Sequence, residues 1–357
     1  MNTLVITILL PALTAFVIGI AITPIVTHYL YTHKVWKKKA GKGAGYGGGG
    51  TPIFDELHKE KDTNTPRMGG IVIWGSVLIT TVLFIILGTQ TNNEVMSTLD
   101  FFSREQTWLP LFALISGAIV GFVDDLLIVR DSGKHFAGGL PLSQRLLVVV
   151  STAAFIAWWF YEKLGVSSVS FFHATPLELG ILFIPFFIFV ATCVYMSSVI
   201  DGIDGLSGGV FLSVFAGYCG VALLQEQYDI AVLCAVLVGS ILAFLWFNIP
   251  PARFYMTETG IMALTMALTV IAFMTDTLGE GIGVSVLPII GFVLLVTVAA
   301  NTIQIVSKKI FKRKVFIVAP LHHHFEALGW PPEKVVMRYW IISMICAVIG
   351  VIIATTA

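Results

Sequence analysis

Long apolar runs alternate with short polar segments along almost the whole chain. A helix needs about 20 predominantly apolar residues to cross a hydrocarbon core roughly 30 Å thick. Runs close to this length predict ten transmembrane helices, at about residues 4–30, 69–88, 108–127, 145–161, 177–199, 207–224, 230–248, 260–275, 282–306 and 336–356. The pattern therefore predicts an all-α, polytopic membrane protein that forms a single transmembrane domain over residues 1–357.

Composition excludes an ordinary soluble domain. Hydrophobic residues make up 57% of the 357 positions and charged residues only 12%, and the mean hydropathy is +0.90. The first apolar run has no basic segment before it and no clear small-residue cleavage site after it. We therefore expect it to be retained as a helix rather than removed as a signal peptide.

The basic residues predict the orientation of the chain. The segments after the first, third, fifth, seventh and ninth runs hold 19 of the 21 Lys and Arg residues, and the opposite side keeps only Arg104 and Lys163. Basic residues concentrate on the cytoplasmic side of membrane proteins. The rich side is therefore expected to be cytoplasmic, with both termini on the extracytoplasmic side.

The longest polar segment, 33–67, contains a run of three lysines and then a glycine-rich stretch over 41–50. The glycines lack the Gly-Lys-Ser/Thr ending of a phosphate-binding loop. We interpret 41–50 as a flexible linker within the domain. The lysines are typical of a contact with anionic lipids.

Acidic pairs mark two of the expected cytoplasmic segments. Asp124 and Asp125 end the third run, where they are either a solvated helix end or a site for Mg²⁺ or a proton. Asp201 and Asp204 lie in a glycine-rich segment after the fifth run and would share one face if the segment were helical. A plain polar turn is the alternative, although such a turn seldom needs two acids and several glycines.

A third cluster runs from Asn248 to Gly260. Pro250 and Pro251 are expected to break the helix there. Glu258 follows at the start of the next run, either as an acid favoured by the helix dipole or as part of a site.

His322, His323 and His324 form the fourth cluster, in a basic loop between the last two runs. At most two of three consecutive histidines can face one ligand on a helix, and Mg²⁺ does not select imidazole. Hydrogen bonds to a pyrophosphate or sugar are therefore favoured. A transition-metal site is the alternative, although no cysteine accompanies them.

All four clusters are expected on the same face of the membrane. Carboxylates with cationic donors suit phosphoryl transfer, in which catalysis consists mainly of positioning and charge neutralisation through Mg²⁺. A secondary transporter would instead place its ionisable residues near the bilayer midplane. A lipid-binding scaffold would not need four such clusters.

The motifs resemble those of the polyprenyl-phosphate N-acetylhexosamine-1-phosphate transferases, in the same order from about residue 50 to the C-terminus. They cover residues 65–70, 121–125, 201–205, 248–260 and 320–326. The triple histidine followed by Phe325 and Glu326 is similar to the muramoyl-pentapeptide branch more than to the N-acetylglucosamine branch.

The resemblance implies a reaction at the bacterial inner membrane. UDP-N-acetylmuramoyl-pentapeptide and undecaprenyl phosphate would give lipid I and UMP, for peptidoglycan synthesis and hence cell shape and division. Transfer from UDP-N-acetylglucosamine is the alternative. The bilayer and these substrates are the expected partners, nucleic acid is not among them, and a homodimer is compatible with the resemblance.

The resemblance also implies roles for residues. Asp124, Asp125 and Asp201 fall at catalytic acids, and Mg²⁺ is expected at Glu258 with Asp201. The substrate-side positions are Lys61, Ser198, Asp204, Asn248, Tyr255, His322, His323 and His324.

Several residues depart from the usual family pattern. Met-Gly-Asp becomes Met256-Thr257-Glu258, which lengthens the expected metal ligand by one methylene. Arg67 replaces a threonine, and Ile128 stands where a lysine is expected. Ser198 replaces an asparagine, and Lys61 lies one residue further from its Thr-Pro motif than usual. These changes indicate a divergent member.

Overall fold

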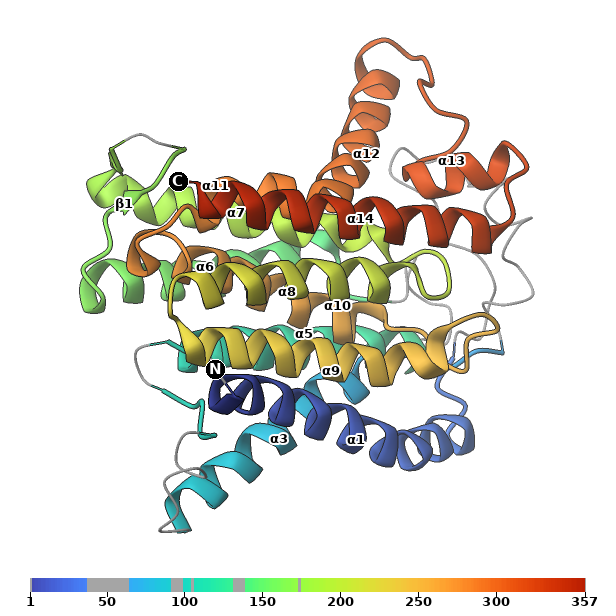
Figure 1. Cartoon of the computed structure of the whole chain (residues 1–357). Helices are drawn as coiled ribbons and strands as arrows, with labels where there is room; N and C mark the ends of the chain where they lie inside the picture. The colour runs from blue at the N-terminus through green and yellow to red at the C-terminus, as the bar shows by residue number, and fades with distance from the viewer. Residues whose placement is uncertain are drawn as a thin grey trace.

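The computed structural model describes residues 2–36, 64–90, 99–103, 106–130, 139–172 and 175–356. Within this part of the chain, ten helical segments are long and apolar enough to cross a membrane, which confirms the predicted polytopic helical architecture. Figure 1 shows them side by side in one bundle. The elements are α1 (Asn2–Thr32), α3 (Ile71–Gln90), α5 (Trp108–Arg130), α6 (Leu142–Lys163), α7 (Phe183–Met196), α8 (Leu206–Leu224), α9 (Tyr228–Asn248), α10 (Thr257–Met274), α11 (Gly283–Ile290), α12 (Phe292–Ile310), α13 (Leu321–Ala327) and α14 (Pro332–Thr355).

Helix α10 forms the centre of the bundle. Nearly all of its residues are buried, because it is apolar on every side and contacts α5, α7 and α3. Helix α5 lies closest to it. A Cβ atom at Gly117 would lie 2.4 Å from the carbonyl oxygen of Met262, and one at Gly121 would lie 2.1 Å from that of Glu258. Small residues thus let the two backbones approach, as they commonly do between membrane helices.

The other long helices surround this pair. Helix α9 packs between α1 and α8, and α14 packs on α8. The short 3-10 helices η1 (Gly180–Leu182) and η2 (Ser197–Ile200) extend α7 at its two ends, and η3 (Thr277–Gly279) follows α10.

The ninth predicted span, 282–306, is not one straight helix. It consists of α11 and α12, which are separate elements that meet at Gly291. Pro288 removes a backbone donor just before this point, and glycine favours a break. Helix α11 packs on α14, whereas α12 leans out of the bundle (Figure 1). The span itself is therefore shifted to Phe292–Ile310.

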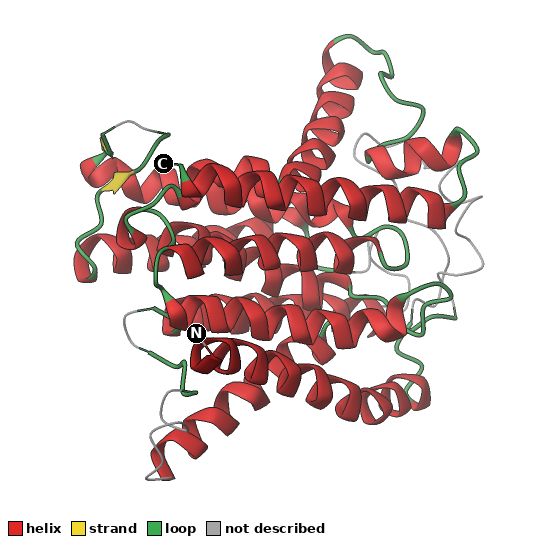
Figure 2. Ribbon diagram, in the orientation of Figure 1, coloured by secondary structure: helices red, strands yellow, loops and turns green. Residues whose placement is uncertain are grey.

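Two further details differ from the sequence pattern. A small antiparallel pair of strands, β1 (Ser168–Val169) and β2 (Leu177–Glu178), precedes α7 and is the exception to the helical architecture among the described residues (Figure 2). The three histidines lie on the short helix α13 rather than in a loop.

Polar segments gather at one end of the bundle. The start of α14, the end of α9 and helix α13 lie at the right of Figure 1, whereas both chain ends lie towards the left. The predicted linker 41–50 and Lys61 lie outside the described residues.

Candidate active site

The site is built around the first turn of α10. Pro250 and Pro251 end the preceding helical segment, so a new helix starts at Thr257 with amide groups that have no partner within the helix. The capping residue, Met256, offers no side-chain hydrogen bond. Two carboxylates from other elements take its place. Asp201 accepts a hydrogen bond from the amide of Thr257 at 2.9 Å, and Asp125 accepts one from the amide of Thr259 at 2.9 Å.

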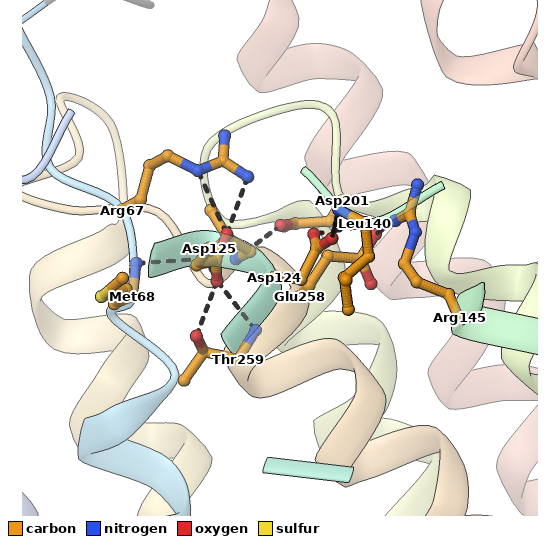
Figure 3. A network of polar contacts seen from close by, with 10 residues as sticks. Arg67, Met68, Asp124, Asp125, Leu140, Arg145, Asp201, Glu258 and Thr259 are labelled. Carbon is orange, nitrogen blue, oxygen red and sulfur yellow. Dashed lines mark hydrogen bonds and ion pairs between the residues drawn. The ribbon is translucent and has the colours of Figure 1, made fainter. Parts of the chain in front are cut away.

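Asp125 has both carboxylate oxygens engaged (Figure 3). Its Oδ1 accepts hydrogen bonds from two nitrogens of Arg67, at 2.9 and 3.1 Å. Its Oδ2 accepts the hydroxyl groups of Thr257 and Thr259, at 2.5 and 2.6 Å, besides the Thr259 amide. The side chain is fully buried. A buried charge is tolerated when it is paired and hydrogen-bonded in this way.

Asp124 is the opposite case, although it is the adjacent residue. Its Oδ1 accepts the amide of Leu140 at 2.7 Å. Its Oδ2 is buried without a hydrogen-bond partner among the described residues and lies 3.9 Å from Arg145. Arg145, near the start of α6, forms its shorter ion pair with Oε1 of Glu258, at 2.5 Å. Oε2 of Glu258 also has no hydrogen-bond partner in the described part of the chain.

Asp201 lies in the turn between η2 and α8. Besides the Thr257 amide, it accepts the hydroxyl of Ser207 at 2.7 Å. Burial raises the pKa of the Asp201 carboxyl, and these two donors act in the opposite direction. The segment is a turn rather than a helix, so Asp201 and Asp204 do not share a helical face; Asp204 instead accepts the amide of Ala252 at 3.4 Å.

The donor set suits a divalent cation completed by substrate. Four acids, Asp124, Asp125, Asp201 and Glu258, share this region with two arginines, Arg67 and Arg145, which leaves two negative charges when every group is ionised. No group of three or more His, Cys, Asp or Glu side chains converges as a metal site within the residues described. Mg²⁺ needs less, because it typically takes one or two carboxylates and fills the other positions with water and phosphate. Asp124 and Glu258 each have one buried oxygen without a hydrogen bond from the described residues, and these oxygens fit such an ion.

The histidines approach the site through Gly202, the residue after Asp201. A Cβ atom at Gly202 would lie 2.5 Å from Nε2 of His322 and 2.7 Å from Nε2 of His323. Both rings are buried, and Nδ1 of His323 lies 2.6 Å from Oε2 of Glu326. His324 points elsewhere, because its Nδ1 accepts the amide of Ile317 at 3.2 Å. Two of the three imidazoles thus face the same backbone, within the limit of two that the sequence sets.

The other predicted substrate residues are arranged differently. Asn248 is buried and bonds within the protein, accepting the amide of Gly205 at 2.9 Å and donating to the carbonyl of Phe254 at 2.8 Å. Ser198 and Tyr255 are half-buried. Asn248 therefore shapes the segment that precedes α10, which contains Tyr255 and leads to Glu258 in the first turn of α10.

Sequence reasoning missed three contributors: Arg145, Thr257 as a bridging group, and Thr259. In the sequence, Arg145 serves only as one of the basic residues that predict the orientation of the chain. Its signal is that a lone arginine stands in the first turn of an apolar span, where an ionisable residue is a functional hypothesis by default. The cation expected at Ile128 is supplied here by Arg67 and Arg145.

Comparison with known proteins agrees with this geometry. The family model "Glycosyl transferase family 4" matches residues 107–276, which include all four acids and Arg145. The ten apolar helices and this match indicate a transferase of the multi-pass membrane class. A phospho-N-acetylmuramoyl-pentapeptide-transferase from Geobacillus sp. (strain WCH70) is 32% identical over 297 residues, covering 82% of this chain and 85% of the relative.

Two other relatives carry the same name. The one from Anoxybacillus flavithermus is 30% identical and covers 95% of each chain. The one from Rickettsia massiliae is 34% identical and covers 83% of this chain and 81% of its own. The chain belongs to the phospho-N-acetylmuramoyl-pentapeptide-transferase family, so it is an enzyme that transfers a phospho-sugar.

Proposed function

We propose that this protein transfers phospho-N-acetylmuramoyl-pentapeptide from its UDP derivative to undecaprenyl phosphate, giving lipid I and UMP for peptidoglycan synthesis. Relatives of that name match up to 95% of the chain. The structural observation that supports it best is the pair of buried carboxylate oxygens, on Asp124 and Glu258, that have no hydrogen-bond partner in the described chain and lie beside Arg145. A divalent cation would bind such oxygens, and substrate phosphate groups would bind that cation and Arg145.

In the proposed reaction, an oxygen of the lipid phosphate forms a bond to the phosphorus that carries the sugar, and the bond from that phosphorus to UMP breaks. Asp124 is the acid best placed to orient or deprotonate the lipid phosphate, because Asp125 is fully used within the protein. Arg145 offers a positive charge beside the reacting phosphates. Direct transfer and transfer in two steps both use these groups.

We propose Mg²⁺ as the cofactor. Glu258 and Asp124 would hold it through the oxygens that accept no hydrogen bond within the described chain, with Asp201 nearby. When bound, the ion would neutralise charge on the pyrophosphate. His322 and His323 would line the sugar or pyrophosphate side, next to Gly202.

The orientation follows from charge. We place the site at the cytoplasmic face of the bacterial inner membrane and both termini outside, because the segments on the site's side carry most of the Lys and Arg residues. The acids stand near helix ends rather than at midspan, which argues against a transporter.

The test is release of UMP by the purified protein with Mg²⁺ and undecaprenyl phosphate. We expect release with UDP-N-acetylmuramoyl-pentapeptide and not with UDP-N-acetylglucosamine. Release with the second donor alone would assign the protein to N-acetylglucosamine transfer. No release with either donor would contradict the enzyme proposal.

A further inference from the structure

Thr257 has an unusual backbone for a β-branched residue. Its φ is +55°, in the left-handed region that side chains branched at Cβ rarely enter. Glycine would adopt this conformation without steric cost. Strained residues of this kind persist where surrounding contacts hold them, and they cluster at functional sites. The side chain of Thr257 is therefore expected to offset the cost through its contacts.

Those contacts join three segments. The hydroxyl of Thr257 donates to Oδ2 of Asp125 at 2.5 Å and accepts the amide of Met68 at 3.1 Å. The amide of Thr257 donates to Oδ2 of Asp201 at 2.9 Å. Met68 also has a positive φ, +66°. The two strained residues, Thr257 and Met68, thus meet at the Thr257 hydroxyl. That hydroxyl binds Asp125 of α5, and the Thr257 amide binds Asp201, which precedes α8.

The contact between Thr257 and Asp125 lies next in sequence to the two acids that have a buried oxygen without a hydrogen bond in the described chain. Asp124 precedes Asp125, and Glu258 follows Thr257. The bond between Asp125 and Thr257 joins α5 to the start of α10, next to the two bonds from Thr259, and so it bears on how Asp124 and Glu258 lie relative to each other. Arg67 holds the other oxygen of Asp125 and keeps that carboxylate in place (Figure 3).

We propose that Thr257 is a positioning residue: its hydroxyl binds Asp125 and so sets the placement of Asp124 against Glu258 for phospho-sugar transfer. The proposal rests on the proposed function. It gives Asp125 a structural role and assigns no chemical step to Thr257.

The test compares Thr257→Gly, Thr257→Val and Thr257→Ser in the UMP-release assay and in thermal unfolding. Glycine relieves the backbone but removes the hydroxyl, so we expect an unfolding temperature close to the parent's and a kcat at least about tenfold lower. KM for the UDP-sugar is expected to change less than about threefold, because the binding groups remain. Serine keeps the hydroxyl and is expected to restore most of the kcat.

Thr265→Val is the matched control. Thr265 is a buried threonine of the same helix, and its hydroxyl donates to the carbonyl of Ile261 in its own helix at 2.8 Å. We expect its kcat to match the parent's. A kcat for Thr257→Gly within about threefold of the parent's, or losses of kcat that simply follow losses of unfolding temperature, would overturn the proposal.

A double-mutant cycle of Thr257→Val with Asp125→Asn separates this proposal from the proposed function. Thermal unfolding reports the coupling of the two residues whether or not the protein is active. Coupling without any UMP release in the parent would overturn the proposed function and leave the contact standing. Additive effects in an active parent would overturn the positioning role.

Discussion

At the scale of single residues, the adjacent acids Asp124 and Asp125 have opposite environments. Asp125 has every oxygen engaged by Arg67, Thr257 and Thr259, whereas Asp124 keeps one buried oxygen without a hydrogen bond in the described chain. Consecutive side chains on a helix point in directions about 100° apart, so neighbouring carboxylates meet different elements. We therefore expect Asp125 to act as a structural acid and Asp124 to be available for chemistry.

Substituting each aspartate separately tests this division. We expect Asp124→Asn to lower kcat at least about a hundredfold while changing stability little, because in the proposed function this group acts on substrate. Asp125→Asn should instead destabilise the fold by about 3 kcal/mol, since it removes the fully buried charge that pairs with the half-buried Arg67. UMP release and thermal unfolding measure the two effects. A large loss of stability in Asp124→Asn with none in Asp125→Asn would reverse the assignment.

The environment of Asp201 predicts a pH dependence. Burial raises the pKa of Asp201, and its ionised form accepts the Ser207 hydroxyl and the Thr257 amide. Removing the Ser207 hydroxyl favours the protonated acid, so the acidic limb of kcat/KM should move to higher pH in Ser207→Ala. Ser213→Ala is the control, because the Ser213 hydroxyl donates to the carbonyl of Gly209 in its own helix. An unchanged limb in Ser207→Ala would mean that Asp201 does not set it.

At the scale of elements, the site depends on how closely α5 approaches α10. Gly117 and Gly121 leave no space for a side chain against the α10 backbone. This approach places the end of α5 beside the first turn of α10, where Asp125 reaches Thr257 and Thr259. The close contact between α5 and α10 therefore sets the relative positions of the acids.

A methyl group at Gly121 should push the helices apart. We expect Gly121→Ala to destabilise the protein by about 1–3 kcal/mol and to reduce activity further than that loss explains, because the Asp125 contacts separate. Gly75→Ala on α3 is the control: its Cβ atom would lie 3.6 Å from Cδ1 of Ile22, which is an ordinary contact. Thermal unfolding and UMP release distinguish the two. Equal stability in both variants would contradict the close approach.

At the scale of the whole molecule, the spans bring polar segments from distant parts of the chain to one end of the bundle. The segment around Arg67, the turn at Asp201 and the first turn of α10 meet there, together with Arg145. Helix α13 adds its histidines beside Gly202. Hydrophobic length places the helices, and the charge of the connecting segments orients the whole bundle.

The proposed orientation can be tested in intact cells with single cysteines that replace exposed lysines. A membrane-impermeant maleimide should label Lys163→Cys, at the end of α6, without permeabilisation. Lys312→Cys, in the basic segment after α12, should be labelled only after permeabilisation. The parent chain, with its four native cysteines, supplies the background. The reverse labelling pattern would invert the topology.

The sequence by itself determined the number of spans and the family, because apolar length and short motifs are local properties of the chain. It also located the four polar clusters and limited the histidines that face one ligand to two at most. Only the tertiary structure decided the partners within the site. Arg145 binds Glu258 113 positions away, and Thr257 binds Asp125 132 positions away. Such pairs depend on which helices pack together and at what distance, and no local pattern records that.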